Sequence, residues 1–93
     1  MVFEWDPVKE EANEQKHGIS FIDAVMVFDD PYHLEEDSTR VEHGEERSRA
    51  IGMMGLKLIT VIYTDRWERR RIISARRSKK DERERYDQGK TTP

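Results

Sequence analysis

The run Leu58–Tyr63 constrains the fold more than any other part of the sequence. Its side chains are apolar or β-branched on both alternations of an extended chain, which is typical of a central strand buried on both faces. Such a strand needs neighbouring strands and a covering layer on each side. Because the chain has 93 residues, of which 34% are hydrophobic and 40% charged, we predict one compact domain over 1–93.

The first thirty residues predict a short strand and two helices. Val2–Trp5 is extended, and Asp6 is the N-cap of a helix over 7–17 that ends at Gly18. Ser20 caps a second helix, in which apolar residues recur at spacings of three and four up to residue 28.

The remainder predicts an antiparallel meander and a last helix. Residues 32–46 are polar and acidic, as in a loop that holds at most one short edge strand. The period then becomes that of strands, which we expect over 47–54, 56–64 and 70–76, followed by a helix over 78–88 and a frayed tail over 89–93. Helices segregated from an antiparallel meander define the α+β class.

Several classes of protein are excluded by features that the sequence lacks. The absence of cysteine excludes disulfide frameworks, thiolate metal sites and cysteine nucleophiles. No secretory signal and no membrane-length apolar run occur, so we expect a cytoplasmic protein without a membrane partner. We expect no cofactor, because dinucleotide, phosphate-loop and nucleophile-elbow motifs are missing. His33 and His43 lie among acidic residues, but without a known metal-binding spacing, and we expect no metal.

Charge is divided unevenly along the chain. Residues 1–46 carry 14 acidic and 3 basic side chains, whereas residues 47–93 carry 14 basic and 6 acidic ones, within a net charge of −3. A basic half of this kind indicates contact with nucleic acid or with an acidic partner.

Three arginines are the first candidates for a site. Arg47 and Arg49 are two residues apart on an expected strand and face the same side. Arg76 ends the third strand, where hairpin pairing can bring it near them. Arginines on one face can hold a phosphodiester and stabilise its pentacovalent transition state. The alternative is that these arginines belong to a solvated salt-bridge surface. The same alternative applies to the last helix, in which three acidic residues can pair with Lys or Arg at i+3 or i+4: Asp81, Glu82 and Glu84.

Lys16 and His17 are the second candidates. A histidine at a helix end titrates near neutrality and can act as a general acid or base, while the lysine can contact a phosphate. The alternative is that both cap the negative end of the helix. Trp67 can stack on bases, whereas Trp5 is expected to pack between the first strand and a helix.

Motifs along nearly the whole chain resemble the BrnT family. They include Phe3–Pro7, Lys16–Phe21, Asp30–Pro31, Gly44–Arg47, Val61–Thr64, Ile72–Arg77, Glu82–Arg83 and Tyr86. The resemblance implies a toxin of a bacterial type II toxin–antitoxin pair, with a RelE-like fold and metal-independent ribonuclease activity that inhibits translation and growth. It also implies a BrnA-like antitoxin with a ribbon-helix-helix domain. The toxin is expected to contact operator DNA only through its complex with this antitoxin.

The expected chemistry is attack by the 2′-OH of the RNA on the adjacent phosphate. We expect the phosphorane to be stabilised by Arg47, Arg49 and Arg76. Lys16 and His17 are expected to contact phosphate and transfer protons, with Glu45 as a weaker candidate for the base.

Arg66 is expected to clamp the RNA and Arg77 to contact it. Two other functions fit the residues. One is a non-catalytic module whose basic half binds nucleic acid or an acidic protein. The other is an interaction protein whose acidic half docks a basic partner.

Overall fold

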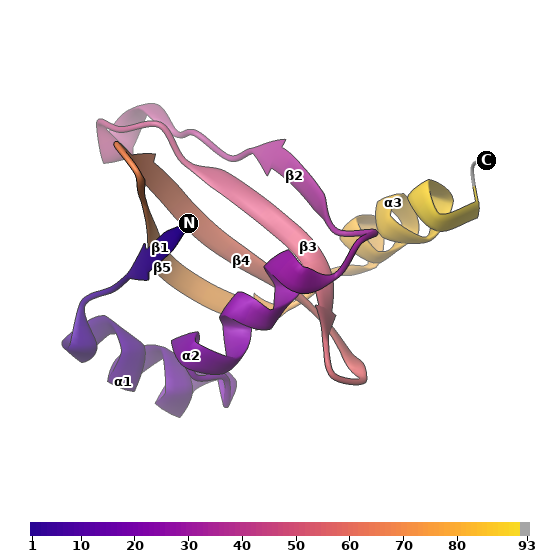
Figure 1. The fold of residues 1–93 in the computed structure, drawn as a ribbon, viewed down its shortest axis with the longest axis horizontal. Coiled ribbons are helices and arrows are strands. Elements are labelled where there is room, and N and C mark those ends of the chain that lie inside the picture. The colour runs from indigo at the N-terminus through magenta and orange to yellow at the C-terminus, as the bar shows by residue number, and fades with distance from the viewer. Residues whose placement is uncertain (92–93) are drawn as a thin grey trace.

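The protein folds around a five-stranded sheet with the order β1-β5-β4-β3-β2 (Figure 1). The structure, a computed structural model, describes residues 1–91 and, among these, all side chains except those of His43 and Thr91. The strands are β1 Val2–Glu4, β2 Leu34–Asp37, β3 Ser48–Met54, β4 Lys57–Arg66 and β5 Arg69–Arg77. β1 runs parallel to β5 and the other neighbours are antiparallel. The prediction of an α+β protein is confirmed.

β4 is the central strand, and different layers cover its two faces. Ile59, Val61 and Tyr63 belong to the main core, which lies under the N-terminal helices. Leu58 belongs to a second cluster on the opposite alternation, with Tyr86 of the last helix. The expectation that 58–63 is buried on both faces is therefore confirmed, with only Ile62 half-exposed.

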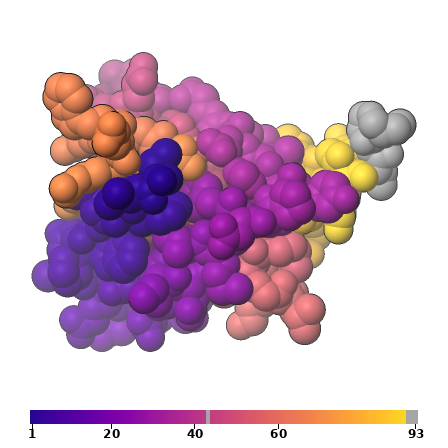
Figure 2. All heavy atoms as spheres, in the orientation of Figure 1, coloured from indigo at the N-terminus to yellow at the C-terminus, as the bar shows by residue number. Residues whose placement is uncertain are grey.

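Two helices and a 3-10 turn cover the first face of the sheet. α1 spans Pro7–His17, α2 spans Phe21–Ala24 and η1 spans Val25–Asp29. As predicted, the Oδ1 of Asp6 accepts the N–H of Val8 at 2.9 Å, and Gly18 ends α1 in the left-handed conformation with a φ of 70°. In Figure 2 this N-terminal layer forms a continuous surface in front of the sheet.

The second helix is shorter than the sequence predicts, because its second half winds as the 3-10 turn η1. This turn passes directly over β3, where a Cβ added to Gly52 would lie 2.9 Å from side-chain atoms of both Val27 and His33. Only glycine allows this close approach.

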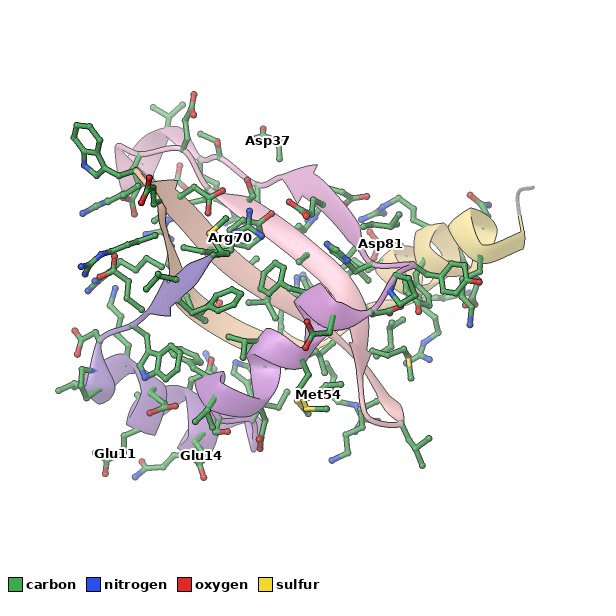
Figure 3. The ribbon with its side chains drawn as sticks, in the orientation of Figure 1. Glu11, Glu14, Asp37, Met54, Arg70 and Asp81 are labelled. Carbon is green, nitrogen blue, oxygen red and sulfur yellow. The ribbon has the colours of Figure 1, made fainter. Side chains whose placement is uncertain are left out.

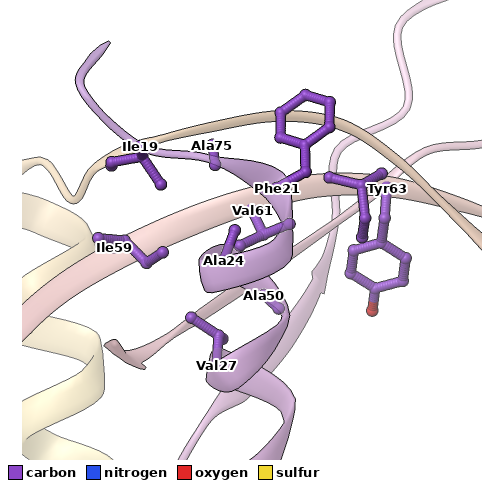
Figure 4. Packing of buried hydrophobic residues seen from close by; sticks show 10 residues of the cluster. Ile19, Phe21, Ala24, Val27, Ala50, Ile59, Val61, Tyr63 and Ala75 are labelled. Carbon is purple, nitrogen blue, oxygen red and sulfur yellow. The ribbon is translucent and has the colours of Figure 1, made fainter. Parts of the chain in front are cut away.

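The main core lies between this helical layer and the sheet (Figure 4). Phe21, Ala24 and Val27 from the helical layer are fully buried against strand residues that include Ala50 and Val61. Trp5 packs on the same cluster, and its ring meets that of Phe21 edge-on with the centroids 6.2 Å apart. Trp5 is therefore a packing residue, as expected.

The last helix, α3, spans Lys80–Thr91 and extends away from the sheet at its far end (Figure 1). Tyr86 is buried against Ile51 and Leu58, and its hydroxyl donates to Asp30 Oδ2 at 2.6 Å. The frayed tail expected over 89–93 is wrong for 89–91, which are helical; residues 92–93 lie outside the described part. Lys90 helps to hold this last turn, with its Nζ 5.5 Å from the ring centroid of Tyr32.

The acidic segment 32–46 contains the short edge strand that the sequence allowed, β2, and a 3-10 turn, η2, at Val41–His43. β2 pairs with β3 from Leu34 to Asp37 and is the edge strand on that side of the sheet. Of the helices in the described part, none is long and apolar enough to cross a membrane.

Asn13 joins α1 to the exposed edge of β5. Its side chain donates to the carbonyl oxygens of Ile19 and Ala75, at 3.0 and 2.9 Å, and accepts the N–H of Ala75 at 3.1 Å. Asn13 is 7% exposed, so these three backbone groups depend on one amide instead of on water.

We predict that Asn13→Ala destabilises the fold by about 2–3 kcal/mol, because it leaves buried backbone groups without partners. Urea denaturation measures this loss. Gln15→Ala, on the exposed side of the same helix, serves as the control and should change the free energy of unfolding by less than about 0.5 kcal/mol. Equal effects of the two substitutions would contradict the anchoring role.

Candidate active site

Five basic side chains line one pocket on the face of the sheet opposite α1 and α2. The pocket, called here the arginine pocket, has a volume of about 210 Å3 and is lined by Ser38, Arg40, Arg47, Arg49, Ile62, Ser74, Arg76 and Lys79. No carboxylate and no imidazole is among these residues. The pocket is therefore suited to an anion with several negative oxygens, such as a phosphodiester.

Strand pairing explains why these residues meet. Arg49 lies opposite Ile62, and Ile62 lies opposite Ser74, so that the three form one row across β3, β4 and β5. Arg76 follows two residues after Ser74 and shares its face. Arg47 immediately precedes β3 and lines the same pocket. The structure thus brings Arg47, Arg49 and Arg76 together, as the sequence led us to expect; their catalytic roles remain predictions.

The carboxylate of Glu82 holds Arg76 and lies near Arg49, whose Nε donates to Oε1 of Glu36 at 2.9 Å. Glu82 lies in the first turn of α3 and is only 1% exposed. Arg76 binds it through two hydrogen bonds, from Nη1 to Oε1 at 2.7 Å and from Nη2 to Oε2 at 2.9 Å. The Nη1 of Arg49 lies 3.7 Å from Oε2. Arg76 is consequently oriented before any ligand arrives.

Two further donors complete the surroundings of Glu82. The backbone N–H of Lys79 and the hydroxyl of Thr60 donate to Oε1 at 2.8 and 3.1 Å. Burial by itself raises the pKa of the Glu82 carboxyl, but the Arg76 hydrogen bonds and the Lys79 N–H outweigh it and lower the pKa to about 2. Glu82 is therefore an anion throughout the neutral range.

The expectation that Glu82 pairs along its own helix is wrong, because its side chain turns into the sheet and not along the helix surface. Asp81 does form such a pair, with its Oδ2 3.2 Å from Nη1 of Arg85 at i+4. Sequence spacing identifies surface pairs of this kind but does not reveal which acidic residue of a helix faces a distant strand.

Glu45 bridges Arg47 of the pocket to Arg66 outside it. Its Oε1 lies 3.3 Å from Nη2 of Arg47, and its Oε2 lies 2.9 Å from Nη2 of Arg66. The hydrogen bonds from Arg66 and then Arg47 lower the pKa of the Glu45 carboxyl. A carboxylate held in this way is a weaker proton acceptor, which reduces its suitability as a general base.

Lys16 and His17 lie in a second pocket, between α1 and β5. It has a volume of about 220 Å3 and is lined by Lys9, Ala12, Asn13, Lys16, His17, Ile73 and Ser74. Ser74 also lines the arginine pocket, so the two pockets adjoin at this residue. Lys16 and His17 therefore line a different pocket from the arginines, and they occupy the last turn of α1.

Arg77 does not join the arginine pocket. It lies opposite Ile59, on the alternation of β5 that faces away from Arg76. Sequence reasoning missed Arg40 and Lys79, which line the pocket from outside the strands. Neither has a carboxylate partner among the side chains that the structure describes. Their positive charge was the only signal in the sequence for a role in the pocket. Because both lie outside the strands, strand periodicity could not predict which face of the sheet they approach.

Many other arginines of the basic half are paired with carboxylates from either half of the chain. Arg70 donates from Nε to Asp65 at 2.7 Å and lies over the ring of Tyr63, at 4.3 Å from its centroid. Arg85 binds Glu36 through Nε at 2.8 Å. Figure 3 contrasts Arg70, which lies against the sheet, with Glu11 and Glu14, which point from α1 into solvent. The salt-bridge alternative thus holds for these arginines. Arg47, Arg49 and Arg76 also contact carboxylates, but they differ in lining the arginine pocket.

His33 is held by two acceptors. Its Nδ1 lies 2.7 Å from the carbonyl oxygen of Asp30, and its Nε2 lies 2.8 Å from Oε2 of Glu35. Burial opposes protonation, but these acceptors outweigh it and raise the pKa of His33. Among the side chains described, which exclude that of His43, no group of three or more histidines and carboxylates is placed to hold a metal ion.

Comparison with known proteins adds one finding. The family model described as a ribonuclease toxin, BrnT, of type II toxin–antitoxin systems matches residues 5–82. The matched span includes every residue that lines either pocket, and it ends at Glu82. No individually curated protein matches the chain.

We predict that the stability contributed by Glu82 depends on pH. Because folding lowers its pKa from 4.5 to about 2, the unfolded chain takes up the proton first. The contribution, on the order of 3 kcal/mol, is fully present above about pH 4.5 and is lost as the pH falls through the folded pKa.

Urea denaturation of the wild type and Glu82→Gln at pH 6, 4 and 3 measures this difference, which should shrink as the pH falls. Glu84→Gln, exposed on the same helix, is the matched control and should show little change at any of these pH values. A Glu82→Gln effect that stays constant with pH would contradict the assignment.

Proposed function

The chain belongs to the BrnT family of ribonuclease toxins of type II toxin–antitoxin systems, and on that premise we propose that the arginine pocket binds the scissile phosphate of RNA. The observation that carries the proposal is the convergence of five cations on one small pocket. The cations come from two distant parts of the chain, residues 40–49 and residues 76–79.

The proposed reaction is cleavage by the RNA itself. The 2′-oxygen attacks the adjacent phosphorus, the bond from phosphorus to the 5′-oxygen breaks, and a 2′,3′-cyclic phosphate and a 5′-hydroxyl result. The pentacovalent intermediate carries additional negative charge on its non-bridging oxygens. Arg47, Arg49 and Arg76 are proposed to stabilise that charge, which is commonly the largest single contribution to such catalysis. Glu82 is proposed as a positioning residue that acts through Arg76.

Two protons move in this reaction, one from the 2′-hydroxyl and one to the 5′-oxygen. The arginine pocket offers only Arg, Lys and Ser side chains besides Ile62. His17, in the adjoining pocket, is the proposed proton carrier, and Lys16 the proposed contact to a neighbouring phosphate. The low pKa of Glu45 supports a role in holding Arg47 and Arg66 more than a role as base.

The proposed mechanism needs no metal ion, because the nucleophile belongs to the substrate and the charge is met by arginine. It also requires RNA, since DNA lacks the 2′-hydroxyl. Membership of a family of type II toxin–antitoxin toxins implies an antitoxin partner. We propose that this partner is BrnA-like, with a ribbon-helix-helix domain that contacts operator DNA, and that the fold is of the RelE-like type.

We predict that the purified protein degrades RNA in the presence of EDTA and leaves DNA of the same sequence intact. Gel analysis of labelled oligonucleotides measures both activities, and a 2′,3′-cyclic phosphate should be found on the upstream product. Loss of cleavage on chelation, or equal cleavage of the DNA, would overturn the mechanism.

Arg40→Ala tests the pocket without disturbing Glu82, because Arg40 has no carboxylate partner among the described side chains. We expect kcat/KM for RNA to fall by about 10- to 100-fold, the loss typical of one charged hydrogen bond. Arg83→Ala removes an equal charge from an exposed position on α3, outside both pockets, and is the matched control. If both substitutions have the same effect, general charge and not the pocket is responsible.

Arg76→Ala leaves Glu82 buried and without its main partner, so this single substitution confounds stability with activity. The pair Arg76→Ala and Glu82→Gln removes both charges together. This double variant should remain folded, as circular dichroism will show, and should lose about 100-fold or more in kcat. Full activity in the folded double variant would place the site elsewhere.

A non-catalytic module that binds nucleic acid is the second candidate function. It is favoured by one observation, that no imidazole or carboxylate lines the arginine pocket. Retention of intact RNA with a steep salt dependence would support it.

A further inference from the structure

We infer that Trp67 is a base-stacking residue, which gives the enzyme a requirement for single-stranded RNA next to the scissile phosphate. The inference rests on the proposed function of the arginine pocket. It concerns the turn between β4 and β5, where Arg66 pairs with Arg69 and only Trp67 and Glu68 lie between them.

The side chain of Trp67 takes no part in the packing of the fold. Its side chain is fully exposed, so it contributes no buried area. Its φ is 58°, and among the residues described no other non-glycine residue has a positive φ. Bulky side chains rarely adopt this conformation, and a two-residue hairpin turn favours glycine at this place.

The other hairpin of the sheet shows the usual solution. Between β3 and β4 the residue in the left-handed conformation is Gly55, with a φ of 61°. Leu56 beside it is equally exposed but has an ordinary backbone. A tryptophan that is both strained and solvent-exposed therefore indicates a contact with another molecule.

The surroundings of Trp67 favour RNA as that molecule. Arg66 is on the same face of β4 as Ile62 of the arginine pocket, and its side chain is 60% exposed. The bridge from Arg66 through Glu45 to Arg47 connects this turn to the pocket wall. Trp67 stands five residues along the strand from Ile62, a distance of about 16 Å, which a few nucleotides span.

Arginines thus lead from Arg66 at the turn to Arg47 at the arginine pocket, with Trp67 at the outer end. A basic groove combined with an aromatic side chain is an arrangement by which proteins hold single-stranded nucleic acid. Phosphates follow the arginines while an unstacked base lies on the indole. A base within a duplex is already stacked and has no free face. Cleavage is therefore restricted to single-stranded segments, with the stacked base a few nucleotides from the scissile phosphate.

The test uses a single-stranded RNA oligonucleotide with 2′-O-methyl groups throughout, which binds without being cut. Its addition should quench the fluorescence of Trp67, whereas Trp5 is packed against the core and should respond little. Trp67→Gly should weaken binding of this probe by about 5- to 100-fold, the range known for one stacked base. Trp67→Phe should retain most of the affinity.

Backbone strain provides a second readout. Glycine relieves the left-handed conformation, so Trp67→Gly should be at least as stable to urea as the wild type while binding more weakly. Leu56→Ala removes an equally exposed apolar side chain from the other hairpin and should leave probe binding unchanged.

Wild-type affinity in Trp67→Gly, or equal binding of a duplex probe, would overturn the inference. The inference would also be overturned if Trp67→Gly bound the probe normally but were no longer neutralised by the antitoxin, because the indole would then bind protein and not RNA. The proposed function fails separately, if the wild type does not cleave unmodified RNA; quenching by the 2′-O-methyl probe would still establish stacking in that case.

Discussion

The bidentate contact between Arg76 and the buried Glu82 is the interaction on which the candidate site depends. A carboxylate that is 1% exposed is stable only with charged or polar partners. Glu82 finds them on β3, β4 and β5 and at Lys79, the residue immediately before α3. The same contact therefore holds α3 against the sheet and orients the guanidinium of Arg76. A change that loosens α3 also removes the fixed direction of the guanidinium, and preorganised charge stabilises a transition state only while it is fixed.

The division of charge along the chain is not the division of charge in space. Much of the acidic half neutralises the basic half, as Glu36 does for Arg49 and Arg85. Arg40, which belongs to the acidic half of the sequence, lines the pocket, whereas Arg70 from the basic half is paired and packed on Tyr63. Arg47, Arg49 and Arg76 of the pocket each contact a carboxylate, so its excess positive charge comes from Arg40 and Lys79, and the sequence total does not locate that place.

Local features were predictable because their causes lie within a few residues. The caps at Asp6 and Gly18, the hairpin at Gly55 and the buried β4 follow from turn chemistry and period. The 3-10 turn η1 was missed, and the close packing of its Val27 on Gly52, more than twenty residues away, is a contact that local periodicity does not reveal. For the site, strand alternation placed Arg47 and Arg49 together, but nothing local distinguishes Glu82 from Asp81 or Glu84.

The proposed mechanism assigns charge stabilisation and proton transfer to two different pockets. A pocket lined by guanidinium groups and Lys79 meets the charge of a phosphorane but is a poor place for a neutral base to gain a proton, since each nearby cation disfavours a second positive charge. His17, the proposed proton carrier, lines the second pocket, which shares only Ser74 with the arginine pocket. Charge stabilisation and proton transfer can then be supplied by different elements of the fold, β3 and β5 for the first and α1 for the second.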